Sequence, residues 1–197
     1  MKLPIILASA SPARLKLLKQ IGITPDQVIP SDIDETELPK ESPRKLAERL
    51  AFEKATAIAN TVDKGIIIGA DTVPAVGRSI MRKATTQDDI RKSMELLSNR
   101  RHRIYTGVCV IKKDEAEYRT LNRVVKSILK FKKLSKAEIE YYCTLEEGIG
   151  NAGGYTVQGY AESYISFLSG SFSNIVGLPL FETMNMLNSV GFYVHHK

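Results

Sequence analysis

The chain has 197 residues, of which 43% are hydrophobic and 25% charged; this is the composition of an ordinary folded domain and excludes wholesale disorder. No hydrophobic run approaches the roughly 20 residues that a membrane-spanning helix needs, and the length predicts one domain over residues 1–197. The 28 Lys and Arg outnumber the 22 Asp and Glu, giving a net charge of +6, which raises the question of a nucleic-acid or polyphosphate partner.

Capping signals and hydrophobic periodicity predict two strand–helix units in the first half of the chain. Serine caps the first turn of a helix and proline fits the first helical position, so Ser–Pro pairs are typical helix starts. The expected elements are a buried strand over residues 3–8, a helix that begins after Ser11 and stops at Gly22, a helix from Pro43 to about residue 60, and a buried strand over residues 65–71 that Asp71 closes.

The second half of the chain is predicted to add a pair of antiparallel strands, over residues 103–111 and 118–131, joined by a polar turn. The helices before and after this pair are expected to begin with capping boxes. Those boxes are Thr86 with Asp89, and Ser135 with Glu138; the second helix ends near Gly148, and a last helix starts at Pro179. This order of elements predicts an α/β fold with a partly antiparallel sheet.

The turn between the first strand and the first helix has the features of an anion-binding site. It contains Ser9 and Ser11, and the helix that follows leaves backbone N–H groups unpaired and carries partial positive charge at its N-terminus. Arg14 and Lys16 add full charges within the first turns. Helix capping alone is the commoner reason for a Ser–Pro pair, and the chain has no P-loop motif.

Three charged residues are candidates for a site. Lys54 falls near the centre of the apolar arc of its predicted helix, where it either extends along the surface to water or points into a cleft and meets negative charge. Asp71 follows a run of isoleucines and would be costly to bury unpaired; it either caps a loop or lies where ligands collect at strand ends. Glu35 belongs to an acidic run that is either a solvated loop or the source of a ligand for Mg²⁺ beside Asp71.

The cysteines and histidines indicate no further site. Cys109 and Cys143 have apolar neighbours and no partner at ligand spacing, so we expect two buried, reduced thiols. The histidines His102, His195 and His196 do not form a set of metal ligands.

The basic residues are concentrated in one segment. Residues 112–136 hold nine Lys or Arg and three Asp or Glu, but they lack the interleaved aromatic residues that stack on bases. A solvated basic strand face is therefore favoured over a polyphosphate-attracting or nucleic-acid-binding patch, and stable nucleic-acid binding is not expected. The N-terminal apolar stretch is too short for a secretory signal and is interrupted by Pro4, so we expect a cytoplasmic protein.

Eight short motifs follow one another along the chain. They are the segments 7–14 (LASASPAR), 34–36 (DET), 54–55 (KA), 69–73 (GADTV), Lys83, 105–108 (YTGV), 153–159 (GGYTVQG) and 170–180 (GSFSNIVGLPL). Each is weak alone, but in this order they resemble the Maf family of nucleoside triphosphate pyrophosphatases over nearly the whole chain.

This resemblance implies a fold and an activity. The fold would be an elongated mixed β-sheet flanked by helices, with two lobes around a deep nucleotide-binding cleft. The activity would be hydrolysis of a nucleoside triphosphate to the monophosphate and pyrophosphate. The resemblance also implies a divalent metal cation (Mg²⁺ or Mn²⁺), a cytoplasmic location and often a homodimer.

The resemblance also assigns roles to individual residues. Asp71 would accept the proton of the attacking water and, together with Glu35, bind the metal. Residues expected to bind the triphosphate are Ser9, Ser11, Arg14, Lys54 and Lys83, and those expected to determine substrate specificity are Ala13, Thr72 and Gln158.

Two positions depart from the family's pattern. Ala13 stands where the family commonly has the first of two arginines, and Lys83 lacks the usual flanking glycine and proline. Thr72 and Gln158 resemble the branch that prefers dTTP and UTP, so we expect that preference. The alternatives are 7-methyl-GTP or a broad specificity within the family, or a non-catalytic nucleotide- or nucleic-acid-binding regulator of cell division.

Overall fold

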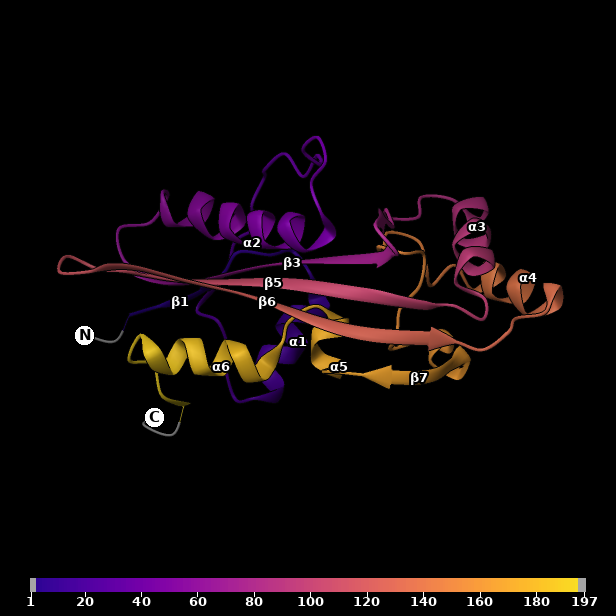
Figure 1. The fold of residues 1–197 in the computed structure, drawn as a ribbon. Helices are drawn as coiled ribbons and strands as arrows, with labels where there is room; N and C mark the ends of the chain where they lie inside the picture. The colour runs from indigo at the N-terminus through magenta and orange to yellow at the C-terminus, as the bar shows by residue number, and fades with distance from the viewer. Residues whose placement is uncertain (1–2, 195–197) are drawn as a thin grey trace.

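A seven-stranded mixed sheet runs through the length of the molecule in the computed structural model, which describes residues 3–194 (Figure 1). The strand order is β2-β1-β3-β5-β6-β7, and β4 pairs with β3. The strands are β1 (Ile5–Leu7), β2 (Gln27–Val28), β3 (Gly65–Val76), β4 (Ser79–Ile80), β5 (Arg101–Lys113), β6 (Tyr118–Phe131) and β7 (Ile165–Ser169). Only the pairs of β1 with β2 and with β3 are parallel, which confirms the expected partly antiparallel α/β sheet.

Residues 3–194 also form six α-helices and one 3-10 helix. They are α1 (Pro12–Gln20), α2 (Pro43–Ala59), α3 (Gln87–Leu97), α4 (Lys136–Leu145), the 3-10 helix η1 (Tyr160–Tyr164), α5 (Phe172–Val176) and α6 (Leu180–Ser189). The four predicted caps are confirmed: the side chains of Ser11, Ser42, Thr86 and Ser135 each accept a hydrogen bond from a backbone N–H of the first turn. None of the helices within residues 3–194 is long and apolar enough to cross a membrane.

Two predicted boundaries were wrong. The helix that begins after Ser135 ends at Leu145, because Glu146 adopts a left-handed conformation with φ of 53°. The strand expected to close at Asp71 continues to Val76. Beyond Ile68, β3 has lost its parallel neighbour β1, and on that side it is paired only at its end, where the short β4 lies beside Ala75 and Val76. Such an edge position accepts proline, here Pro74.

Two glycines let helix α2 lie directly on the sheet. A Cβ atom at Gly69 in β3 would come within 2.5 Å of the carbonyl oxygen of Ala51, and one at Gly107 in β5 within 2.0 Å of that of Ala47. Real Cβ atoms do not approach backbone this closely, so only glycine fits. As Figure 1 shows, α2 covers one face of the sheet, while α1 and α6 lie on the other.

The buried hydrophobic residues of the described chain form four clusters: two lie against α2, and the two largest lie toward the two ends of the molecule. One of these two gathers around α3 and α4 and includes Met94 and Phe131, and the other lies around β1, α1 and α6. Strand β5 contributes to both, through Ile104 to the first and Val110 to the second. The expected two-lobed, elongated sheet is therefore confirmed, with strands that continue from one lobe into the other. Both cysteines are buried and unpaired, as expected, while His195 and His196 lie outside the described residues.

Candidate active site

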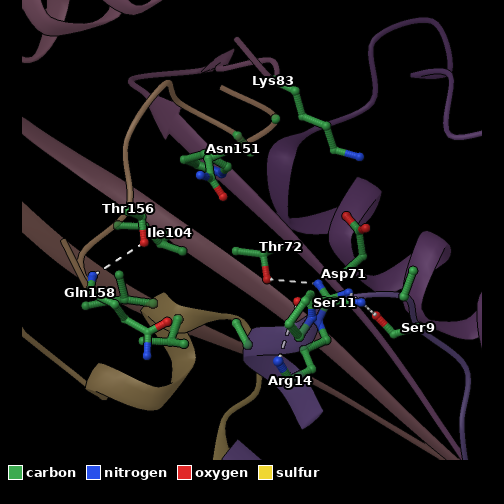
Figure 2. Close-up of a pocket in the computed structure, with 18 of the residues that line it drawn as sticks. Ser9, Ser11, Arg14, Asp71, Thr72, Lys83, Ile104, Asn151, Thr156 and Gln158 are labelled. Carbon is green, nitrogen blue, oxygen red and sulfur yellow. Dashed lines mark hydrogen bonds between the residues drawn. The ribbon is translucent and has the colours of Figure 1, made fainter. Parts of the chain in front are cut away.

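A cavity of about 470 Å³ lies between the two lobes, within the size range typical of small-molecule sites. Its walls come from the turn between β1 and α1, the loop before α2, strand β3, the segment after β4 and the glycine-rich loop after α4. All ten sequence-predicted residues line it: Ser9, Ser11, Ala13, Arg14, Glu35, Lys54, Asp71, Thr72, Lys83 and Gln158. Figure 2 shows Asp71, Thr72, Ser9 and Arg14 on one wall and Gln158 and Thr156 on the opposite one.

Lys54 joins two carboxylates at the floor of this cavity. Its ammonium nitrogen lies 2.6 Å from Asp71 Oδ1 and 2.6 Å from Glu35 Oε1, and the residue is only 7% exposed. A buried ammonium group is stable only when it is paired, and the close packing of α2 on β3 brings this pair together. Of the two alternatives for Lys54, the structure therefore shows the second: it points into the cleft and meets negative charge.

Asp71 owes its position to the interruption of the sheet. It is 8% exposed and pairs with Gly107 of β5 in the middle of β3, just beyond the point where β1 ends. It is thus an internal strand residue rather than the end of a strand. Its exposure to the cavity arises because the parallel neighbour stops short, which leaves a crevice at the carboxyl end of β1 of the kind where ligands bind in α/β sheets.

Glu35 is held as a carboxylate by two lysines. Burial favours its neutral form, but the hydrogen bond and charge of Lys54, together with the charge of Lys83, outweigh this and lower the pKa of Glu35. Lys83 lies in the segment after β4, with its ammonium nitrogen 3.4 Å from Glu35 Oε2, and its side chain is exposed at the mouth of the cavity. The acidic run therefore contributes one residue, Glu35, to the site.

Arg14 connects the turn at the start of α1 to the cavity wall. Its guanidinium donates to Ser9 Oγ at 2.9 Å, to the carbonyl oxygen of Gly177 at 2.9 Å and to Thr72 Oγ1 at 3.3 Å. Burial lowers the pKa of Arg14, and the negative charges of Asp71 and Glu35 oppose this effect. An arginine fixed by three hydrogen bonds beside a helix N-terminus forms an anion-binding corner.

The glycine-rich loop supplies the opposite wall. It contains Asn151, Tyr155 and the exposed Gln158, whose backbone N–H donates to Thr156 Oγ1 at 3.4 Å. The buried Tyr155 hydroxyl lies 2.5 Å from His102 Nε2. The sequence analysis gave no role to Asn151, Tyr155 or His102. Tyr155 lies within the motif at residues 153–159, and the density of glycines was the signal for Asn151.

Asp71 and Glu35 are suited to bind a hard divalent cation only if a bound substrate supplies further oxygen ligands. Asp71 and Glu35 converge on a single cation, the Lys54 ammonium, and Mg²⁺ is commonly bound by one or two carboxylates plus substrate phosphates and water. Within residues 3–194 there is no group of three or more His, Cys, Asp or Glu residues that could hold a metal by itself. A metal bound here would therefore need oxygens from the substrate.

Comparisons with known proteins identify the family of this chain. A family model described as Maf-like protein matches residues 4–190. A Rickettsia felis protein named nucleoside triphosphate pyrophosphatase is 55% identical over 196 residues, which cover 99% of this chain and 97% of that protein. A Rickettsia canadensis protein of the same name is 52% identical, covering 98% and 96%. The solved structure of the Staphylococcus aureus Ham1 protein superposes with a TM-score of 0.44 and 19% identity over 64% of this chain and 71% of that chain, a likeness too loose to support an inference.

Proposed function

This chain belongs to the Maf family, and we propose that it is a nucleoside triphosphate pyrophosphatase whose active site is the cavity between the lobes. The reaction hydrolyses the bond between the α- and β-phosphates and releases a nucleoside monophosphate and pyrophosphate. The observation that carries the proposal is the convergence of Asp71, Glu35 and Lys54 in a cavity that Arg14 and Lys83 also line. The names of the relatives support the same reaction.

Cationic groups would hold the triphosphate. Arg14, Lys54 and Lys83 reach the cavity from three separate segments, and the N-terminus of α1 adds backbone dipoles that favour anions. Ser9 accepts a hydrogen bond from Arg14 and keeps its own hydroxyl proton for a phosphate oxygen. Ser11 likewise accepts at the helix cap through its oxygen, which leaves its proton to donate.

Asp71 would act as the general base. Lys54 occupies its Oδ1 atom, so we assign Oδ2 the role of accepting the proton from water as the water oxygen forms a bond to phosphorus. The bond from phosphorus to the bridging oxygen breaks, and pyrophosphate leaves with its charge neutralised by the lysines and arginine. Asp71 and Glu35 would also hold a Mg²⁺ or Mn²⁺ ion, which supplies further positive charge to the phosphoryl oxygens when bound.

Two residues on facing walls of the cavity would recognise the nucleobase. Thr72 and Gln158 face the cavity from β3 and from the glycine-rich loop, and they favour dTTP or UTP over the alternatives of 7-methyl-GTP or a broad specificity. Ala13 leaves this site without the arginine that the family commonly carries there.

The proposal is tested by measuring pyrophosphate released from a panel of canonical and modified triphosphates with Mg²⁺ or Mn²⁺ present. Asp71→Asn should fold and bind nucleotide but lose activity by roughly 10²- to 10⁴-fold, the typical contribution of a general base. The matched control is Asp63→Asn, which removes an exposed carboxylate just before the same strand and should leave the rate unchanged. Tight nucleotide binding without pyrophosphate release by the unmodified protein would instead favour a non-catalytic regulator.

A further inference from the structure

A short chain of hydrogen bonds leads from the cavity wall into the sheet. Thr72 of β3 and Thr106 of β5 are directly opposite each other, and their hydroxyl oxygens are 3.1 Å apart. Thr106 is fully buried, and its hydroxyl donates to the backbone carbonyl oxygen of Asn174, in α5, at 2.7 Å. Of the residues joined by these hydrogen bonds, Thr72 is the one that lines the cavity.

The direction of each hydrogen bond follows from counting protons. A carbonyl oxygen can only accept and a threonine hydroxyl carries one proton, so the proton of Thr106 points to Asn174. Thr106 must therefore accept in its contact with Thr72, and the single proton of Thr72 is directed at Thr106. Thr72 also accepts from the Arg14 guanidinium at 3.3 Å. It has no proton left for a ligand and can offer only a lone pair.

The carbonyl at the end of this chain is fixed in place. Asn174 is fully buried, and its side-chain amide donates to Ser127 Oγ at 2.9 Å. Ser127, also fully buried, donates in turn to the carbonyl oxygen of Ser171, the residue that caps α5, at 3.1 Å. Because every group beyond Thr106 is anchored, the donor-to-acceptor direction of these hydrogen bonds cannot reverse when a ligand binds.

We propose that Thr106 is a positioning residue that makes Thr72 an obligate hydrogen-bond acceptor, so that the part of the nucleotide facing Thr72 must be a donor. This inference rests on the proposed function, whose specificity it deepens. A phosphate oxygen or a base carbonyl cannot satisfy Thr72. The groups that can are a ring N–H, such as N3–H of uracil and thymine, and a sugar hydroxyl. If the donor is the ring N–H, cytosine, which presents a lone pair at N3, would be rejected.

The first test uses the unmodified protein and compares kcat/KM for UTP, CTP, N3-methyl-UTP and 2′,3′-dideoxy-UTP. A missing donor leaves a buried acceptor unpaired, and the expected loss is about 10- to 100-fold. Loss with CTP and N3-methyl-UTP assigns the donor to the base, and loss with the dideoxy nucleotide assigns it to the sugar. Equal rates with all four nucleotides would overturn the inference.

The second test removes the positioning residue. Thr106→Val should free the Thr72 proton, so that Thr72 can also donate, and should reduce the discrimination between the preferred nucleotide and its donor-lacking analogue by at least about tenfold. Thr106→Ser keeps the hydroxyl and should restore the original ratio. The matched control is Thr183→Val, because Thr183 is also fully buried and donates to a backbone carbonyl, that of Pro179, at 2.8 Å. A ratio that is unchanged in Thr106→Val, or changed equally in Thr183→Val, would refute the role of Thr106.

Binding measurements separate this inference from the proposed function. Affinities of the Asp71→Asn protein for the same four nucleotides report discrimination without turnover. Discrimination in binding without hydrolysis by the unmodified protein would reject the pyrophosphatase activity alone. Hydrolysis without discrimination would reject the donor requirement alone.

Discussion

His102 should make the stability of this protein depend steeply on pH. The residue is 1% exposed, and burial lowers its pKa from 6.5 to about 4. Its Nε2 atom is paired with Tyr155, while Nδ1 is buried without a hydrogen-bond partner. Protonation would place a donor on each nitrogen, one of them unsatisfied, so the folded state keeps the ring neutral.

The size of the effect follows from linkage. Between pH 6.5 and about pH 4, the unfolded chain binds a proton that the folded protein does not, so stability falls as the pH falls through this window. His102 should lower the free energy of unfolding by about 2 kcal/mol when the pH falls from about 7.5 to about 5. The whole pKa shift corresponds to about 3 kcal/mol, which is reached only at still lower pH.

The assay is urea unfolding at the two pH values for the unmodified protein and for His102→Gln. Glutamine can place a polar atom near the Nε2 position but does not titrate. On acidification, the free energy of unfolding of the variant should therefore fall by about 2 kcal/mol less than that of the unmodified protein. Tyr155→Phe is the control: burial alone lowers the pKa, so this variant should keep the steep dependence. Identical acid losses in the unmodified protein and His102→Gln would refute the reasoning.

Two further predictions concern packing and thiol chemistry. Gly107→Ala should lower the free energy of unfolding by several kcal/mol, because its Cβ would lie 2.0 Å from the Ala47 carbonyl oxygen; this is the range of overpacked or strained sites. The control is Gly77→Ala, where a Cβ meets nothing within 4 Å but φ is +61°. It should lower the free energy of unfolding by only about 1 kcal/mol. Cys109 and Cys143 should resist alkylation in the native protein and react after unfolding, since burial raises the pKa of Cys109 to about 12 and also raises that of Cys143; rapid labelling of the native protein at neutral pH would contradict the buried positions.

Local signals in the sequence predicted the helix starts and the convergence of charge. Ser11 and Ser42 act over one helical turn, and such short-range capping can be recognised without tertiary structure. Lys54 and Asp71 could be singled out because a lysine within an apolar arc and a carboxylate after three isoleucines are each costly to bury unpaired, although extension of Lys54 to water and loop capping by Asp71 also fitted the sequence. The two requirements satisfy each other in the structure.

The remaining features depend on contacts that sequence patterns do not report. Asp71 was predicted to close its strand, but β3 continues because β5 pairs with it as far as Ala75, a long-range contact that the local sequence does not report. The close approach of α2 depends on Gly69 and Gly107, which lie on different strands. Their role is seen only when the position of α2 on the sheet is known. His102 alternates with two arginines as a solvated strand entry would, but its side chain turns into the core of one lobe.

The continuity of β5 through both lobes determines how the cavity can open. All of β5 from Arg101 to Lys113 is paired with β6, so a rigid-body swing of one lobe would shear this hydrogen-bonded ladder. At the rim of the cavity, the segment after β4 and the glycine-rich loop are joined by three backbone hydrogen bonds: Gly150 donates to Ala84, Ala84 to Asn151 and Gly153 to Arg82. Both rim segments are anchored in the core of one lobe, through Met81, Ala84, Tyr155 and Val157. Nucleotide would then enter, and pyrophosphate leave, with the two lobes held in one relative position and the reacting groups on β3 kept in place.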